Sequence, residues 1–151
     1  MRVIFLDFDG VIVPFAKKYQ KRRPALVSAE AVTCLNAVIK ETGAKLVITS
    51  SWRKFAPIEK LDECVKKWGV VGDVVGKTVS LNKSRGKEIA DWLQGAPEFF
   101  HLLDPIESYV ILDDEEDMDP VKDHLVKVQN PVLGLLMSEA LQAIEILRGK
   151  P

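Results

Sequence analysis

Residues 3–10, which read VIFLDFDG, decide the fold. The first four of them form an unbroken apolar run, which is typical of a strand that is buried on both faces of a sheet. The run ends at Asp7, and the glycine that follows the second acid, Asp9, predicts a turn. This stretch therefore predicts a buried strand that delivers two carboxylates to the carboxyl end of a sheet.

Patterns typical of strands and helices alternate along the rest of the chain. Apolar runs predict further strands at residues 45–48, 109–112 and 125–128. Apolar residues three and four apart predict helices at residues 28–42, 58–68, 85–94 and 138–147. We therefore expect the α/β class: a single doubly wound, Rossmann-like domain over residues 1–151, with a central parallel sheet and helices on both faces. Only about eighteen residues separate Asp9 from Ser28, too few for an independently packed cap domain.

The composition is that of one ordinary globular domain. Of the 151 residues 47% are hydrophobic, and 21 basic side chains nearly balance 22 acidic ones, for a formal net charge of −1. A chain of this length needs neither disulfides nor a structural metal to bury a core. The balanced charge gives no overall electrostatic reason to bind nucleic acid or a membrane surface.

The N-terminus and the cysteines indicate the compartment. The first apolar run is far too short for a signal peptide or a membrane span, so we expect a cytoplasmic protein with no membrane partner. Cys34 and Cys64 would then stay reduced, and both are expected to face the core. Nothing in the sequence indicates an obligate protein partner.

Polar residues with metal and phosphate chemistry follow the predicted strands directly. They are Asp7 and Asp9 after the first strand, Thr49 and Ser50 after the second, and Asp113 and Asp114 after residues 109–112. The carboxyl ends of parallel strands meet at one edge, so four carboxylates would converge and would repel one another without a cation. An all-oxygen set of this kind suits Mg²⁺. A basic residue from the start of the next helix, Lys83, Arg85 or Lys87, would complete a site for a phosphoryl group.

These motifs, in this order, resemble those of the haloacid dehalogenase (HAD) phosphohydrolase superfamily. Three segments are similar to the motifs of a small capless group that includes the HAD domains of RNA-repair proteins. These segments are VITSSWR at 47–53, RGKEIADWL at 85–93 and ILDD at 111–114. The resemblance implies a HAD-like domain over residues 1–151. It also implies a Mg²⁺-dependent phosphomonoesterase that works through an aspartyl-phosphate intermediate.

The resemblance further implies a role for each residue at the strand ends. Asp7 would be the nucleophile that takes the phosphoryl group as an acyl phosphate. Asp9 would be the general acid and base, and its backbone carbonyl would help to bind the metal. Thr49 would donate a hydrogen bond to a phosphoryl oxygen, with Ser50 as the close alternative because strand ends are uncertain by a residue.

The metal ligands and the cation follow from the same resemblance. The implied metal set is Asp7, Asp9, Asp113 and Asp114. By motif register Asp114 is the better ligand of the acidic pair, with Asp113 supporting or sharing. Arg85 is the preferred cation because it begins an RGxxI segment, although the family usually has Lys at this position. Lys83 and Lys87 therefore remain alternative cations, and Lys83 is also a candidate substrate-binding residue.

Several features also have a plainer structural reading. The acid-glycine stretch could be a simple turn, the acidic run 113–117 a solvated loop, and the hydroxyls at 49–51 a helix cap. Trp52 and Arg53 could contact a substrate, but a packing role is favoured. The basic segment 17–23, KKYQKRR, could attract a polyanion or could simply be a solubilising loop, and the two readings have nearly equal weight.

The expected substrate is an accessible phosphate, with a nucleotide or a nucleic-acid end favoured. One alternative is a phosphatase for a small metabolite. Another is a phosphoacceptor module resembling a receiver domain, which does not turn over. Receiver domains place their metal-binding acid pair after the first strand and the phosphoacceptor after the third, whereas here the acid pair comes late. The order therefore favours the phosphatase.

Overall fold

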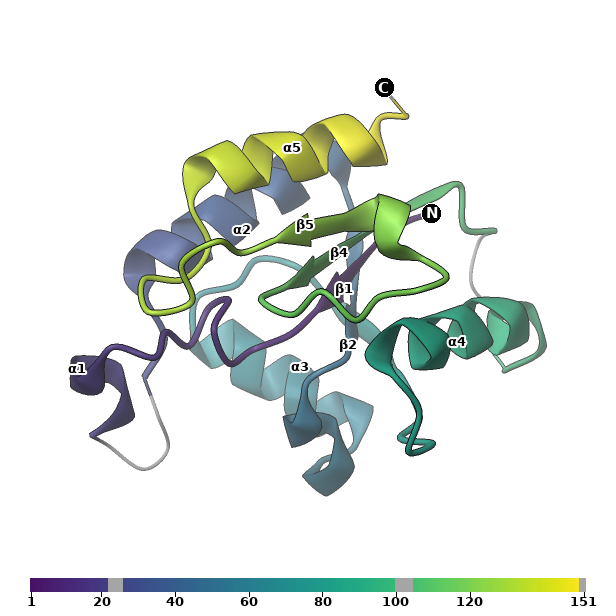
Figure 1. Cartoon of the computed structure of the whole chain (residues 1–151), viewed down its shortest axis with the longest axis horizontal. Helices are drawn as coiled ribbons and strands as arrows, with labels where there is room; N and C mark the ends of the chain where they lie inside the picture. The colour runs from purple at the N-terminus through teal and green to yellow at the C-terminus, as the bar shows by residue number, and fades with distance from the viewer. Residues whose placement is uncertain (22–25, 100–104, 150–151) are drawn as a thin grey trace.

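A five-stranded parallel sheet forms the centre of the computed structural model, which describes residues 1–21, 26–99 and 105–149 (Figure 1). The strands are β1 (Arg2–Leu6), β2 (Lys45–Ile48), β3 (Val74–Lys77), β4 (Ser108–Asp113) and β5 (Leu125–Lys127). Their order is β3-β2-β1-β4-β5, and every neighbouring pair is parallel. The direction of winding reverses between β1 and β4, where ligands bind in open α/β sheets.

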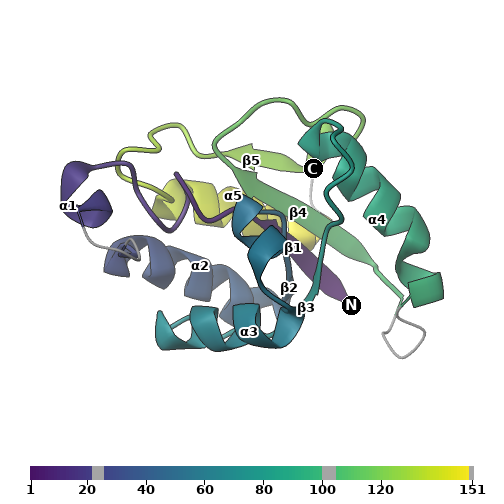
Figure 2. The same cartoon turned by 90° about the horizontal axis from the view of Figure 1, so that it is seen from below.

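Helices cover both faces of this sheet, which confirms the predicted Rossmann-like α/β class. The described residues form α1 (Lys17–Gln20), α2 (Ala29–Thr42), α3 (Ile58–Lys67), α4 (Arg85–Phe99) and α5 (Met137–Leu147), and the 3-10 helices η1 (Ser51–Phe55) and η2 (Lys122–His124). Figure 2 shows α4 on one side of the sheet and α2, α3 and α5 on the other. Between Asp9 and α2 the described residues form only the short helix α1.

The residues of β1 alternate between two apolar clusters. Ile4 belongs to the larger cluster, which the sheet forms with α2, α3 and α5. Val3 and Phe5 belong to the smaller one, together with Ile89 and Trp92 of α4. The rings of Phe5 and Trp92 meet edge to face with their centroids 5.5 Å apart. The first strand is therefore buried on both faces, as its unbroken apolar run predicts.

The bounds of α2 follow from its capping residues. The hydroxyl of Ser28 accepts a hydrogen bond from the backbone nitrogen of Ala31 at 3.1 Å, a contact worth about 1 kcal/mol. Gly43 ends the helix in the left-handed region with φ of 69°. Both ends of this helix are those that the sequence predicts.

Other details differ from the sequence prediction. The helix predicted at 85–94 continues to Phe99, because a single glycine, Gly95, is tolerated inside a helix and does not end this one. Cys64 is half-buried rather than in the core, whereas Cys34 is buried as expected. The helices α1 and η1 were not predicted, since four or five residues carry too little periodicity to be recognised.

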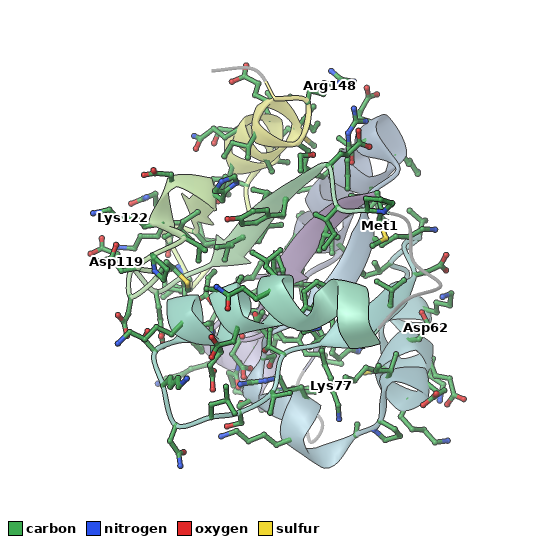
Figure 3. All side chains as sticks on the ribbon, turned by 90° about the vertical axis from the view of Figure 1, so that its right-hand side faces the viewer. Met1, Asp62, Lys77, Asp119, Lys122 and Arg148 are labelled. Atoms are coloured by element: carbon green, nitrogen blue, oxygen red, sulfur yellow. The ribbon has the colours of Figure 1, made fainter. Side chains whose placement is uncertain are left out.

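Charged side chains such as those of Lys122 and Arg148 project from the outside of the molecule (Figure 3). Among the helices of the described residues, none has the length and apolar character needed to cross a lipid bilayer.

Candidate active site

Three carboxylates meet where β1 and β4 end. Asp7 follows β1 and Asp113 is the last residue of β4, and the backbone nitrogen of Asp7 still donates to the carbonyl of Leu112 at 3.1 Å. Together with Asp114, these side chains each offer an oxygen within 4.8 Å of the others. Asp7 is 5% exposed and Asp113 is fully buried. The neighbouring strand ends thus hold three acids together, two of them buried and Asp114 partly exposed.

One guanidinium lies among these acids. Nη1 of Arg85, the first residue of α4, is 3.1 Å from Oδ2 of Asp7 and 2.7 Å from Oδ2 of Asp113. Burial and then the charge of Asp113 raise the pKa of Asp7 to about 8, against the opposing effect of Arg85. Burial and the charge of Asp113 likewise raise the pKa of Asp114 to about 6. The single positive charge of the guanidinium therefore does not neutralise the negative charge that three ionised carboxylates would carry.

The donor set fits a divalent cation. Asp7, Asp113 and Asp114 provide only oxygen atoms, which Mg²⁺ prefers, and a second positive charge would relieve their repulsion. The carboxylate of Asp9 is not one of this group. Its Oδ2 instead accepts a hydrogen bond from Nε1 of Trp52 at 3.1 Å. Of the four carboxylates that were expected to converge, the structure thus brings together three. For Asp9, the metal-binding atom that the resemblance implies is the backbone carbonyl and not the side chain.

Gly10 allows the acidic loop to approach the end of β1. Its φ of +83° is in the region that favours glycine. A Cβ atom at this position would lie 2.7 Å from Oδ2 of Asp114 and 3.1 Å from Cε2 of Phe15. Any other residue would therefore displace the Asp114 carboxylate.

Thr49 and Ser50, which the sequence left as alternatives, have different partners. Thr49 directly follows β2, and its fully buried Oγ1 has no hydrogen-bond partner among the described residues. Oγ of Ser50 accepts a hydrogen bond from the backbone nitrogen of Trp52 at 3.3 Å and so caps η1. A buried hydroxyl without a partner costs about 1–3 kcal/mol, and of these two hydroxyls only that of Thr49 has no hydrogen-bond partner among the described residues.

The three candidate cations, too, differ in their contacts. Only Arg85 reaches the carboxylates, while Lys83 pairs with Asp91 at 3.1 Å and Lys87 is exposed. Gly86 explains the position of Arg85, because a Cβ atom there would collide with the backbone of Met118 in the loop after β4. The start of α4 can therefore pack directly against the acidic loop.

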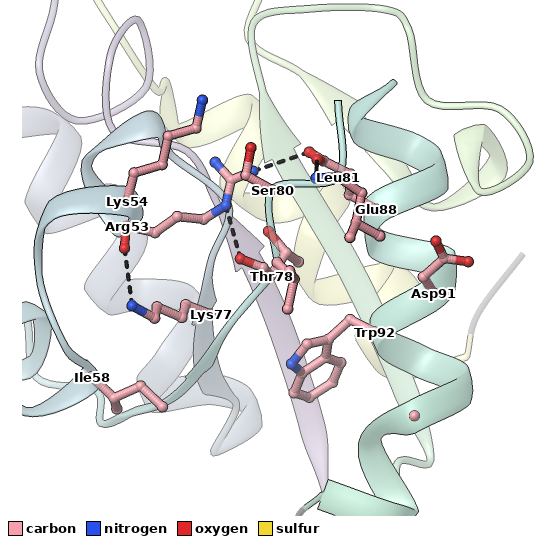
Figure 4. Close-up of a pocket in the computed structure, with 12 residues that line it drawn as sticks. Arg53, Lys54, Ile58, Lys77, Thr78, Ser80, Leu81, Glu88, Asp91 and Trp92 are labelled. Atoms are coloured by element: carbon pink, nitrogen blue, oxygen red, sulfur yellow. Dashed lines mark hydrogen bonds and ion pairs between the residues drawn. The ribbon is translucent and has the colours of Figure 1, made fainter. Parts of the chain in front are cut away.

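Arg53 is a structural residue, as favoured from the sequence. Its guanidinium is 5% exposed and forms an ion pair with Glu88 of α4 at 3.0 Å (Figure 4). Nη1 also donates to the carbonyl of Thr49 at 2.8 Å, and Nε donates to the carbonyl of Thr78 at 2.9 Å. This one side chain ties the segments after β2 and β3 to the helix that begins with Arg85.

A pocket of about 680 Å³ opens beside this ion pair (Figure 4). It lies between η1, the segment after β3 and α4, and Trp92 forms part of its wall. None of the four candidate aspartates lines it. The pocket is therefore separate from the carboxylate cluster at the ends of β1 and β4.

Trp52 has both a packing and a polar contact. Its ring meets those of Phe8 and Trp68 edge to face, each with a centroid separation of 5.5 Å, which confirms the packing role. Its bond to Asp9 joins residues that are 43 positions apart. Sequence reasoning missed this contact, since no local pattern pairs the two residues.

The described part of the basic segment, residues 17–21, lies beyond the carboxyl ends of the strands, where Figure 1 shows α1. Lys17, Lys18 and Lys21 are exposed, and none of them forms an ion pair with another described residue. Arg22 and Arg23, the other two charges of the segment, lie outside the described residues.

Comparison with known proteins gives one match. A family model described as the HAD domain in Swiss Army Knife RNA repair proteins matches residues 3–140. Searches of curated proteins and of solved structures found no match. The matched range includes every candidate site residue.

Proposed function

The chain belongs to the family of HAD domains found in Swiss Army Knife RNA repair proteins, and from this membership and the site geometry we propose that it is a Mg²⁺-dependent phosphomonoesterase. The observation that carries the proposal is the meeting of Asp7, Asp113 and Asp114 with Arg85, next to a Thr49 hydroxyl that has no hydrogen-bond partner in the described part of the chain. Residues 1–151 would act as one catalytic domain. A cytoplasmic location is part of the proposal.

The first step would transfer the phosphoryl group to Asp7. An oxygen of Asp7 forms a bond to phosphorus while the bond from phosphorus to the leaving oxygen breaks. The electron pair of that bond goes to the leaving oxygen, which takes a proton from Asp9. The product of this step is an acyl phosphate on Asp7.

The second step would regenerate the enzyme. Asp9, now a carboxylate, takes a proton from water as the water oxygen attacks phosphorus. The bond between phosphorus and Asp7 breaks, and its electron pair returns to the carboxylate. Inorganic phosphate leaves, and Asp9 is protonated again.

Two protein groups would hold the phosphoryl oxygens during both steps. The hydroxyl of Thr49 would donate one hydrogen bond, and the guanidinium of Arg85 would supply positive charge. Asp7, Asp113 and Asp114, with the backbone carbonyl of Asp9, would hold Mg²⁺, which supplies electrostatic stabilisation of the charge on the phosphoryl oxygens.

The favoured substrates are nucleotides and phosphorylated nucleic-acid ends. Three observations support this choice: the RNA-repair description of the family, the exposed lysines of the segment 17–21, and the position of α1 beyond the carboxyl ends of the strands (Figure 1). Lysines at this place would contact the phosphates of the chain that carries the reacting terminal phosphate. A phosphatase for small metabolites is the second candidate.

A screen for released phosphate tests the proposal. It covers p-nitrophenyl phosphate, mononucleotides, sugar phosphates and oligonucleotides with a 3′- or 5′-phosphate, each with Mg²⁺ and with EDTA. We expect Mg²⁺-dependent turnover that the Asp7→Asn variant lacks. A single phosphorylation of Asp7 by acetyl phosphate without turnover would instead favour the receiver-like module.

A further inference from the structure

Trp52 contacts the residue that the proposed reaction uses twice. Its Nε1 lies 3.1 Å from Oδ2 of Asp9, in a partly buried position. This is the one hydrogen bond that the described residues give to the Asp9 carboxylate. The proposed chemistry itself requires nothing from Trp52, so the contact calls for an explanation of its own.

The orientation of the indole is fixed without help from Asp9. The ring of Trp52 packs edge to face against Phe8 and Trp68, with interplanar angles of 87° and 71°. Its backbone nitrogen donates to Oγ of Ser50, which starts η1. The N–H group is therefore presented at a fixed place, and Asp9 is the partner that adjusts to it.

The backbone of Asp9 is fixed as well. Asp9 forms an isolated bridge with Val13, and the nitrogen of Gly10 donates to the carbonyl of Val13 at 2.8 Å. What remains free is the rotation of the carboxylate about its side-chain bonds. The indole N–H limits this rotation because one oxygen must stay within hydrogen-bond distance of it.

We propose that Trp52 is a positioning residue that assigns different tasks to the two oxygens of Asp9. The indole nitrogen is a donor only, so Oδ2 remains an acceptor in both protonation states of Asp9. Oδ1 is then the oxygen that gives a proton to the leaving group and later takes one from water. This inference rests on the proposed function, because it assigns a role within that reaction.

The test compares two substrates of nearly the same shape. Phenyl phosphate has a more basic leaving oxygen than p-nitrophenyl phosphate, so its cleavage depends more on the proton from Asp9. The ratio kcat/KM reports the steps up to cleavage of the bond to the leaving group. The Trp52→Phe variant keeps an aromatic ring but removes the N–H group.

For Trp52→Phe we expect kcat/KM to fall at least about tenfold on phenyl phosphate and less than about threefold on p-nitrophenyl phosphate. The matched control is Trp68→Phe, which alters the same aromatic cluster without touching Asp9, and it should change both substrates equally. In an Asp9→Asn background, Trp52→Phe should cause no additional loss. An equal loss on both substrates, or a full additional loss in that background, would show that Trp52 only packs.

Two further measurements keep the interpretation clear. If Trp52→Phe folds poorly, 3-benzothienylalanine at position 52 preserves the ring volume and replaces only the N–H group, and the same difference between substrates is expected. The rise in thermal midpoint with Mg²⁺ should not change in either variant, because Trp52 contacts only the side chain of Asp9, which lies outside the carboxylate cluster. If the wild-type protein releases phosphate neither from any substrate of the screen nor from phenyl phosphate, the proposed function is wrong and the role of Trp52 is rejected with it. If it hydrolyses phenyl and p-nitrophenyl phosphate and the variants match it, only the role of Trp52 is rejected.

Discussion

The guanidinium of Arg85 lies 3.1 Å from the carboxylate of Asp7, so the first residue of α4 faces the residue that follows β1. The same Nη1 is 2.7 Å from Asp113, which makes Arg85 a bridge between two strand ends. The HAD phosphohydrolases that the chain resembles usually have Lys at this place. A planar guanidinium can span two carboxylates and still offer a second nitrogen, which an ammonium cannot do in the same geometry.

Replacing this cation gives the first prediction. Arg85→Lys should lower kcat/KM about 10–100-fold, because the ammonium keeps the charge but loses the spread of donors. Arg85→Ala should lower it further. Lys83→Ala is the control, since Lys83 pairs with Asp91 outside the cluster. Steady-state kinetics on p-nitrophenyl phosphate provide the comparison, and similar losses for Arg85→Ala and Lys83→Ala would contradict the assignment.

The nucleophile gives the second prediction. Asp7→Asn should abolish turnover, with a loss of several orders of magnitude. Because Asp7 is buried beside two other acids, the neutral amide also removes repulsion, so the thermal midpoint in EDTA should stay equal or rise. Calorimetry measures the thermal midpoint of the variant, and phosphate release measures its turnover. A variant that retains substantial Mg²⁺-dependent hydrolysis would exclude Asp7 as the nucleophile.

Metal dependence is the third prediction. EDTA should stop turnover, and Mg²⁺ should restore it and raise the thermal midpoint, since a bound cation stabilises only the folded state. Asp114→Ala should raise the Mg²⁺ concentration needed for half-maximal activity far more than Glu116→Ala. Glu116 is a suitable control because it is exposed and pairs with Lys127 at 2.7 Å. Equal effects of the two substitutions would reject the metal assignment.

The glycine after the two acids gives the fourth prediction. Gly10→Ala should lower the thermal midpoint and weaken Mg²⁺ binding, because the new Cβ would lie against Asp114. Gly43→Ala is a matched control: Gly43 also has a positive φ, of 69°, but no atom within 4 Å of the added Cβ. It should cost only about 1–2 kcal/mol for the backbone conformation and leave the Mg²⁺ titration unchanged. If both variants bind Mg²⁺ like the wild type, Gly10 has no role at the metal site.

The fifth prediction concerns the exposed lysines. Replacing Lys17, Lys18 and Lys21 with Gln should lower kcat/KM on phosphorylated oligonucleotides several-fold at low salt, and the difference should shrink as salt rises. Activity on p-nitrophenyl phosphate should hardly change, since that substrate has no second phosphate. If the variant shows the same change in kcat/KM on both substrates at low salt, the segment is a solubilising loop and does not bind the substrate.

The sequence predicted the carboxyl edge of the sheet well, because a buried parallel strand is a continuous apolar run and the residue after it must lie at that edge. Asp7 and Asp113 are both found there. It could not separate Thr49 from Ser50, since that choice depends on which hydroxyl caps η1. It also missed the bond between Trp52 and Asp9, because loops that are distant along the chain bring those two residues together.

The packing of α4 couples the stability of the protein to its chemistry. Ile89 and Trp92 of α4 cover the side of β1 that carries Val3 and Phe5, and each contributes roughly 1.5–3 kcal/mol by burial. Arg85 stands one helical turn before Ile89, so any opening that frees this apolar face also withdraws the guanidinium from Asp7. Native-state hydrogen exchange of α4 and the loss of the proposed activity on heating would then report the same event, because Arg85 leaves the carboxylates as the sheet is uncovered.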